Sequence, residues 1–235
     1  MENRFHIVIV GSGPAGLSAA GRAALRDKKA RESDPGFFQA NGGYSHLLLE
    51  SFDKPAKTIQ RYQKGKHVMA EPGFLDLRSD FNFAESSRET ILESWDQSIS
   101  ESDVNIRYGC EVTAIAGQQG DFKLTLKDGS AIAAEYVVLS IGLEGNPRKL
   151  GVAGEDQPLV QYTLDDPSAY HDERIIVVGA GDSAIENALA LSKQNTVAIL
   201  NRRDEFSRAK EGNLNAILSA NTDANVPLQC FYSTS

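Results

Sequence analysis

The chain has 235 residues, a formal net charge of −8 and only two cysteines. The acidic balance argues against a nucleic-acid partner, and no stretch approaches the ~20 consecutive apolar residues of a membrane span. Two unpaired cysteines suit a reducing compartment, and no zinc-type spacing occurs in the sequence. We therefore expect a cytoplasmic enzyme of one or two domains, with no metal and no membrane partner.

The first expected element is a strand that runs into a glycine-rich turn. Residues 5–10 are almost all apolar, as in a parallel strand buried on both faces, and Gly11-Ser12-Gly13-Pro14-Ala15-Gly16 follows. Gly11 allows a tight turn, Gly13 lets the backbone approach a pyrophosphate, and Gly16 lets a helix pack on the strand. Pro14 fits a first helical turn. The pattern predicts a dinucleotide site; a structural turn without a ligand is the alternative.

The second expected strand ends in an acid, Glu50. A carboxylate there binds the ribose hydroxyls of a dinucleotide, but it usually comes about 20 residues after the turn. Here the separation is longer, and the excess lies in residues 27–44, which are charged at first and then rich in Gly, Pro and Asn. We expect a surface loop over 27–44 and predict Glu50 as the ribose ligand. An ordinary exposed carboxylate is the alternative.

The middle of the chain predicts a helix and a strand meander. Ser86 and Glu89 have the spacing of a capping box, which begins a helix that reaches about Ile99. Strands are expected over 110–116, 121–127 and 130–140. Asp128 and Gly129 join the last two strands and are typical of a hairpin turn.

A second turn of the same kind follows an apolar strand at 174–178. It reads Gly179-Ala180-Gly181-Asp182-Ser183-Ala184, with a helix expected over 183–193 and a strand over 196–200. Arg202 and Arg203 come after that strand, where a carboxylate would bind a free ribose 2′-hydroxyl. Guanidinium groups instead suit a 2′-phosphate, so we predict NADPH rather than NADH. Two solvated arginines are the alternative.

These motifs together resemble the thioredoxin-reductase-like branch of the FAD/NAD(P)H-dependent pyridine nucleotide-disulfide oxidoreductases. The resemblance implies an α/β fold of two Rossmann-like, three-layer ββα domains. The FAD-binding domain would span 1–145, and the NAD(P)H-binding domain would span 146–235 with a linker over 146–171. The implied FAD residues are Gly11, Gly13, Pro14, Ala15, Gly16, Glu50, Val112 and Gly142; the implied NADPH residues are Gly179, Gly181, Asp182, Ser183, Glu186, Arg202, Arg203 and Arg208. Glu186 has an alternative role as the capping partner of Ser183.

Two features depart from that family. Its Cys-x-x-Cys pair is replaced by Tyr162-Thr163-Leu164-Asp165, and Cys110 and Cys230 are expected to be small core residues. The sequence also stops at Ser235, after a strand expected over 226–232. The segment that completes the FAD domain in the family does not follow. We therefore expect a C-terminally truncated chain with an incomplete second domain, for which retention of FAD is an open question.

The resemblance implies an FAD-dependent oxidoreductase that passes a hydride from NADPH to the flavin. Electrons would continue to a small-molecule or small redox-protein acceptor without a protein dithiol. The family also suggests a homodimer. The alternative is a nucleotide-binding, redox-sensing or regulatory module of a larger electron-transfer protein. The sequence names neither the acceptor nor a catalytic residue.

Overall fold

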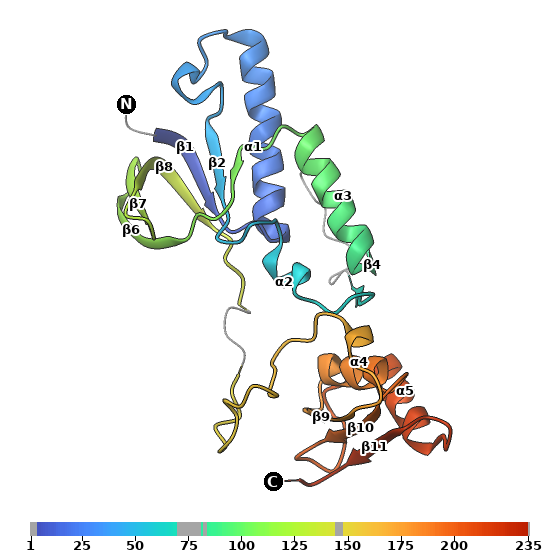
Figure 1. The fold of residues 1–235 in the computed structure, drawn as a ribbon. Coiled ribbons are helices and arrows are strands. Elements are labelled where there is room, and N and C mark those ends of the chain that lie inside the picture. The colour runs from blue at the N-terminus through green and yellow to red at the C-terminus, as the bar shows by residue number, and fades with distance from the viewer. Residues whose placement is uncertain (1–3, 70–80, 82–83, 144–147, 235) are drawn as a thin grey trace. The chain divides into compact units, whose positions relative to one another are not determined.

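The structure, a computed structural model, describes residues 4–69, 81, 84–143 and 148–234. The chain forms two compact units (Figure 1). Unit 1 contains Met1–Arg61 and His67–Glu155, and unit 2 contains Tyr62–Lys66 and Asp156–Ser235. The domain boundary expected at 145/146 falls on residues outside the described ranges.

Unit 1 is built on a six-stranded sheet with the order β5-β2-β1-β8-β7-β6. Its strands are β1 (Arg4–Val10), β2 (His46–Leu49), β5 (Ile106–Arg107), β6 (Val112–Gln118), β7 (Asp121–Leu126) and β8 (Ala131–Leu139). The strands β5, β2, β1 and β8 are parallel, whereas β8, β7 and β6 pair antiparallel. All four residues of β2 are buried, as expected for a central strand with both faces covered.

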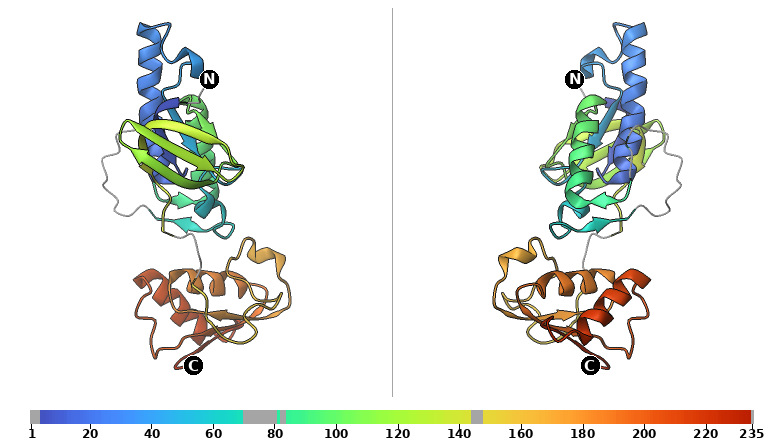
Figure 2. Two further views of the ribbon diagram at one scale, coloured as in Figure 1. Left: turned by 90° about the vertical axis from the view of Figure 1, so that its left-hand side faces the viewer. Right: turned by 90° about the vertical axis from the view of Figure 1, so that its right-hand side faces the viewer.

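The meander is present and is continuous with the parallel strands, because β8 pairs with both β1 and β7. Gly129 has φ of +84° in the turn between β7 and β8, which confirms the expected hairpin. The β6–β7 pair lies on one side of β1 and β2, and the helices of unit 1 lie on the other side, as Figure 2 shows. The expected mixed α/β fold is therefore confirmed.

Unit 1 contains α1 (Pro14–Ser33), α2 (Lys57–Gln60) and α3 (Arg88–Glu101), with a short 3-10 turn η1 at Gln39–Asn41. A two-residue strand pair, β3 (His67–Val68) and β4 (Ser86–Ser87), completes its elements. The expectation of a loop over 27–44 is wrong for its first part, because α1 continues to Ser33. Asp27 is only 1% exposed. The charged run therefore belongs to a helix whose inner face carries a buried carboxylate.

The start of α3 is displaced by one residue from the predicted capping box. Ser87, not Ser86, is the N-cap, and its Oγ accepts a hydrogen bond from the Thr90 amide at 3.2 Å. Ser86 pairs with Val68 and Ser87 with His67 in the short β3–β4 ladder, so both serines lie in β4. The helix begins at Arg88, which makes Ser87 the residue directly ahead of it and therefore its cap.

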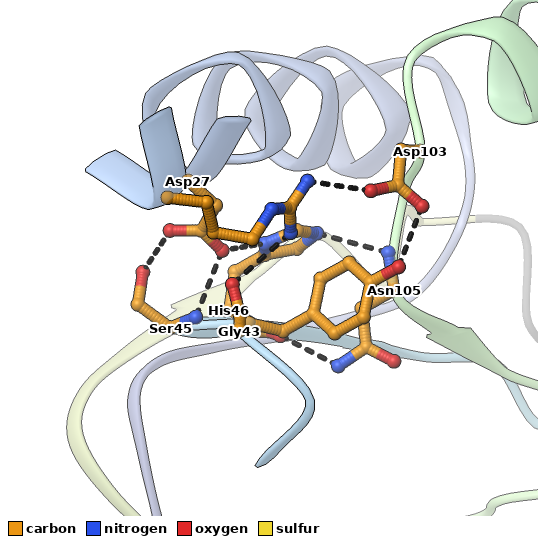
Figure 3. A network of polar contacts seen from close by, with 8 residues as sticks. Asp27, Gly43, Ser45, His46, Asp103 and Asn105 are labelled. Atoms are coloured by element: carbon orange, nitrogen blue, oxygen red, sulfur yellow. Dashed lines mark hydrogen bonds and ion pairs between the residues drawn. The ribbon is translucent and has the colours of Figure 1, made fainter. Parts of the chain in front are cut away.

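A buried polar network joins α1, β2 and the segment before β5 (Figure 3). His46 Nδ1 lies 2.6 Å from Asp27 Oδ2, and both side chains are at most 1% exposed. The Asn105 amide donates to His46 Nε2 at 3.0 Å, so His46 is neutral and its Nδ1–H donates to Asp27. The Ser45 amide and hydroxyl also donate to Asp27. This network fastens the long helix to the end of its crossover loop.

Unit 2 is a three-stranded parallel sheet with the order β11-β10-β9. Its elements are η2 (Pro167–Ala169), β9 (Arg174–Val178), α4 (Asp182–Leu191), β10 (Thr196–Leu200), α5 (Glu211–Thr222) and β11 (Leu228–Phe231). The core combines the inner faces of the two helices with alternate residues of the strands; its fully buried members are Ile185, Ala188, Ile199 and Ile217. This βαβαβ arrangement places the second glycine-rich turn between β9 and α4.

Among the described helices, none is both long and apolar enough to cross a membrane.

Candidate functional site

The first glycine-rich turn connects β1 to α1 and is bonded to the end of β2. The Gly11 amide donates to the Leu49 carbonyl at 2.8 Å, which links the turn to the end of β2. Gly13 is the N-cap of α1, and Pro14 is at the first helical position. The amides at a helix start have no intrahelical acceptors. The turn therefore presents helix-start amides and the positive end of a 20-residue helix to the same point.

The three glycines of this turn are required for different reasons. Gly11 has φ of +98°, and an added Cβ would lie 2.6 Å from the Ser140 carbonyl oxygen. At Gly16 a Cβ would lie 1.8 Å from the Gly11 carbonyl oxygen. At Gly13 a Cβ would have no described protein atom within 4 Å, and its φ of −69° is open to any residue. Packing of the described chain therefore does not require a glycine at 13, and this position is open to the close approach of a ligand.

Ser140, which follows β8, borders this turn. The Ser140 hydroxyl lies 2.9 Å from the carbonyl oxygens of both Val10 and Gly11, and its amide donates to Val10 at 2.9 Å. Gly142 follows two residues later with φ of +67°. Val112 begins β6 and is paired with Leu126. Ser140 therefore holds the strand end against the turn, a role that the sequence did not indicate.

Glu50 lies beside the first turn, but protein donors already engage both of its carboxylate oxygens. The Ser12 amide and hydroxyl donate to Oε2 at 3.0 and 2.5 Å. Ser51 Oγ and the Phe52 amide donate to Oε1 at 3.2 and 2.9 Å. Burial raises the pKa of Glu50, but these donors outweigh it and hold that pKa below its ordinary value. Glu50 is therefore ionised and 5% exposed, rather than the freely exposed carboxylate of the alternative hypothesis.

The second turn repeats the same geometry between β9 and α4. The Gly179 amide donates to the Leu200 carbonyl at 3.0 Å, as Gly11 does to the neighbouring strand in unit 1. Gly179 has φ of +139°. Gly181 is the N-cap of α4, and a Cβ there would meet no described atom within 4 Å. The middle glycine is again left unexplained by packing, which favours a ligand at this turn as well.

Asp182 and Ser183 are the first two residues of α4. Asp182 Oδ1 accepts hydrogen bonds from the Lys210 amide at 2.9 Å and from Asn213 Nδ2 at 2.8 Å. Burial raises the pKa of Asp182, but the Lys210 and Asn213 donors bring it below its ordinary value. Asp182 thus ties the start of α4 to the start of α5.

The loop after β10 presents three arginines on a fixed frame. Arg202, Arg203 and Arg208 are all exposed, whereas Asn201 and Phe206 between them are 2% and 3% exposed. Asn201 Nδ2 donates to the Glu205 carbonyl at 2.8 Å, and its Oδ1 accepts from the Arg203 amide at 3.0 Å. Asn201 occupies the position where an acid would bind a free ribose hydroxyl, and here its side chain shapes the arginine loop instead.

Glu186 is not a capping partner of Ser183, because the N-cap of α4 is Gly181 and has no side-chain cap. Its Oε2 forms an ion pair with Lys66 Nζ at 2.7 Å, and its Oε1 accepts from Asn213 Nδ2 at 3.1 Å. Lys66 was missed by sequence reasoning, because nothing local connects a loop lysine to a helix so distant along the chain.

Both cysteines are free thiols. Cys110 lies just before β6, and Cys230 lies in β11; each is half-buried rather than fully in a core. Burial raises the pKa of the Cys230 thiol, which lowers its reactivity. Leu164, within the tetrapeptide that replaces the cysteine pair, packs on the core of unit 2. Within the described residues no cluster of His, Cys, Asp or Glu could hold a metal ion.

Comparison with known proteins agrees with this arrangement. Residues 48–227 match the family described as pyridine nucleotide-disulphide oxidoreductase. The chain belongs to this family. Both the arginine loop and the second glycine-rich turn lie inside the matched range, and the first turn lies ahead of it.

Individual relatives are similar to this chain over most of its length. A ferredoxin–NADP reductase of Ignicoccus hospitalis is 26% identical over 201 residues, which are 85% of this chain and 57% of that protein. A thioredoxin reductase of Treponema pallidum is 30% identical over 216 residues, 89% of this chain and 60% of that protein. The chain thus spans about three-fifths of the length of these curated relatives.

Solved structures share the fold. The bacillithiol disulfide reductase Bdr (YpdA) from Staphylococcus aureus has a TM-score of 0.79 at 20% identity, covering 99% of this chain and 67% of that structure. A thioredoxin reductase from Lactococcus lactis has a TM-score of 0.69 at 21% identity. These likenesses confirm the Rossmann-type architecture.

Proposed function

We propose that this chain is the nucleotide-binding portion of an FAD-dependent oxidoreductase that takes a hydride from NADPH. The observation that carries the proposal is the pair of middle glycines, Gly13 and Gly181. Both are helix N-caps with ordinary φ, and a Cβ added at either one would have no described protein atom within 4 Å. Two such openings, one in each unit, suit two dinucleotides.

The residues of unit 1 suit FAD. Gly13 leaves room for a pyrophosphate at the start of α1, while Gly11, Gly16 and Ser140 hold the turn. Glu50 would accept a ribose hydroxyl only by exchanging one of its present donors, and Ser51 Oγ, at 3.2 Å, is the longest of these. Proximity to the turn supports this role for Glu50. Bound FAD would supply the redox chemistry, by accepting a hydride and releasing two electrons.

The residues of unit 2 suit NADPH. Gly181 leaves room for the pyrophosphate, and Arg202 and Arg203 stand on the loop that follows the next strand of the sheet. Guanidinium groups bind a phosphate through charge-assisted hydrogen bonds, whereas a free 2′-hydroxyl offers them no charge. Arg208 lies on the same loop, two residues after the buried Phe206, and would add to the positive charge near the 2′-phosphate.

The acceptor follows from the relatives and from the missing dithiol. Relatives of this chain are named ferredoxin–NADP reductase and thioredoxin reductase, which points to a small redox protein or a small molecule as acceptor. Because Tyr162-Thr163-Leu164-Asp165 carries no thiol, electrons would leave the flavin without a protein disulfide. A homodimer and a cytoplasmic location complete the proposal.

A visible spectrum and an anaerobic titration test this function. The purified chain, with FAD supplied, should show a flavin band that NADPH bleaches at lower concentration than NADH does. Arg202→Gln with Arg203→Gln should weaken NADPH about 10-fold or more and leave NADH within about 2-fold, since each charged hydrogen bond contributes about 1.5–3 kcal/mol. Arg174→Gln, an exposed arginine at the start of β9, is the matched control. Failure to bind either nucleotide would refute the proposal.

A regulatory module is the second candidate, favoured by the departure from the family's cysteine pair. Such a module would bind both nucleotides and be reduced by NADPH, yet would not turn over with ferredoxin, flavodoxin or low-molecular-weight disulfides. Steady-state NADPH oxidation with each of these acceptors separates the two candidates.

A further inference from the structure

A five-residue segment from the first half of the sequence is part of unit 2. Tyr62–Lys66 groups with unit 2, although the chain on either side of it belongs to unit 1. The Lys64 amide donates to the Asp165 carbonyl at 2.7 Å, and Lys64 Nζ lies 3.5 Å from Asp166 Oδ2. Lys66 Nζ lies 2.7 Å from Glu186 Oε2 in the first half of α4.

The two lysines of this segment differ in environment. The side chains of Lys66 and Glu186 are 15% and 26% exposed, and Lys66 Nζ lies 4.8 Å from the centroid of the Tyr62 ring. The side chains of Lys64 and Asp166 are 67% and 37% exposed. Solvent screens the outer pair strongly and the inner pair much less. Lys66 is therefore the lysine whose charge acts on α4.

The start of α4 has an electrostatic difficulty as an anion site. Asp182 is its first residue, and Glu186 follows one helical turn, or ~6 Å, along the axis. The first turn of α1, by contrast, carries no acid. Two carboxylates near a pyrophosphate would oppose the attraction of the helix dipole. Asn213 donates to both carboxylates, and the Lys210 amide donates to Asp182. Of the two, Glu186 is the carboxylate that forms a direct ion pair, and its partner is Lys66.

We propose that Lys66 is a positioning residue of the second nucleotide site: its ammonium holds and neutralises Glu186, so that the N-terminus of α4 accepts dinucleotide phosphates. The inference rests on the proposed function, because it assigns a role within the same site. Glu186 is the carboxylate that Lys66 contacts directly, and the Lys66 charge also helps to lower the pKa of Asp182. The larger part of its effect should therefore depend on the charge at position 186.

A double-mutant cycle on the full chain tests this role. NADP⁺ binding is measured by calorimetry for the wild type, Lys66→Met, Glu186→Gln and the double variant. Without Lys66 the unpaired carboxylate should weaken NADP⁺ about 5- to 10-fold at low salt. The double variant should return to within about 2-fold of wild type, because the charge that needed compensation is gone. The difference between Lys66→Met and wild type should shrink at 0.5 M salt, roughly as the Debye length falls.

Lys64→Met is the matched control, since it removes the same charge from the same segment and should change NADP⁺ affinity less than about 2-fold. Thermal unfolding of each variant reports whether the segment merely supports the fold. An unchanged affinity for Lys66→Met overturns the inference and leaves the proposed function standing. Equal losses from Lys66→Met with Glu or with Gln at position 186 also overturn it, because compensation would then have no part. A wild-type chain that binds no NADP⁺ overturns both the inference and the proposed function.

Discussion

The buried carboxylate of Asp27 should contribute a large share of the stability of unit 1. Asp27 accepts from the Ser45 amide at 2.8 Å, from the Ser45 hydroxyl, and from His46 Nδ1 at 2.6 Å. An asparagine at position 27 would keep one acceptor oxygen, but its amide NH₂ would face groups of Ser45 and His46 that themselves donate hydrogen bonds. Hydrogen bonds to a charged group contribute about 1.5–3 kcal/mol each, and they are not additive. We expect Asp27→Asn to lower the free energy of unfolding by about 3 kcal/mol.

Urea unfolding followed by tryptophan fluorescence measures this loss. Trp95 is the sole tryptophan of the chain, lies in α3 of unit 1 and is 2% exposed, so its emission reports on unit 1. Asp103→Asn is the matched control. Asp103 accepts from Arg31 and Tyr44, but its side chain is 48% exposed, so its loss should be about 1 kcal/mol or less.

The pH dependence has a definite sign. Burial raises the pKa of Asp27, but the hydrogen bonds from His46 and Ser45 outweigh it and lower that pKa below its ordinary value. A group with a lowered folded-state pKa stabilises the protein above its unfolded pKa of about 3.9, and this contribution is lost as the pH falls through the folded value. The gap between wild type and Asp27→Asn should be constant above about pH 5 and shrink below about pH 4. A gap no larger than that of the control, or one undiminished at pH 3, would refute the reasoning.

Three further predictions concern the turns. Gly16→Ala should cost unit 1 more than about 3 kcal/mol, because its Cβ would meet the Gly11 carbonyl at 1.8 Å. Gly13→Ala should lower the free energy of unfolding by about 1 kcal/mol or less, yet abolish flavin retention. Urea unfolding measures the stability and the flavin spectrum measures the retention. Equal stability losses for Gly13→Ala and Gly16→Ala would contradict the different roles given to the two glycines. Glu50→Gln should lower the free energy of unfolding, measured by urea, by about 1–3 kcal/mol, since the new amide group would donate toward one of the four groups that now donate to Glu50. Because the pKa of Glu50 is lowered, this cost should persist above about pH 5 and fade as the medium becomes more acidic.

The local parts of the fold were predictable from sequence, because their signals lie within a few residues. Both glycine-rich turns, the strands before them and the Gly129 hairpin follow from backbone conformation and apolar pattern alone. The end of α1 was not predictable in this way. Residues 27–33 are charged enough to suit a loop, and the partners that make a buried Asp27 favourable in a helix, Ser45 and His46, lie beyond the loop.

The same limit applies to the candidate sites. Glu50 could be placed beside the first turn from its position at a strand end, but its four protein donors depend on Ser12 and the chain beyond β2. The shape of the arginine loop depends on the hydrogen bonds of Asn201. In the sequence, Asn201 indicated only that no acid follows the strand, and its structural role had no local signal. Lys66 has no sequence signal, because its partner is set by a tertiary contact.

The placement of Tyr62–Lys66 has a consequence for the modularity of this protein. The chain passes from one unit to the other after Arg61, returns after Lys66, and passes again after Glu155. No single cut therefore releases unit 2 as an uninterrupted length of sequence. A gene fragment encoding only residues 156–235 would leave Glu186 without the lysine that neutralises it. Recombination that exchanges such a fragment between homologues would have to preserve a matching basic residue in the recipient's first half.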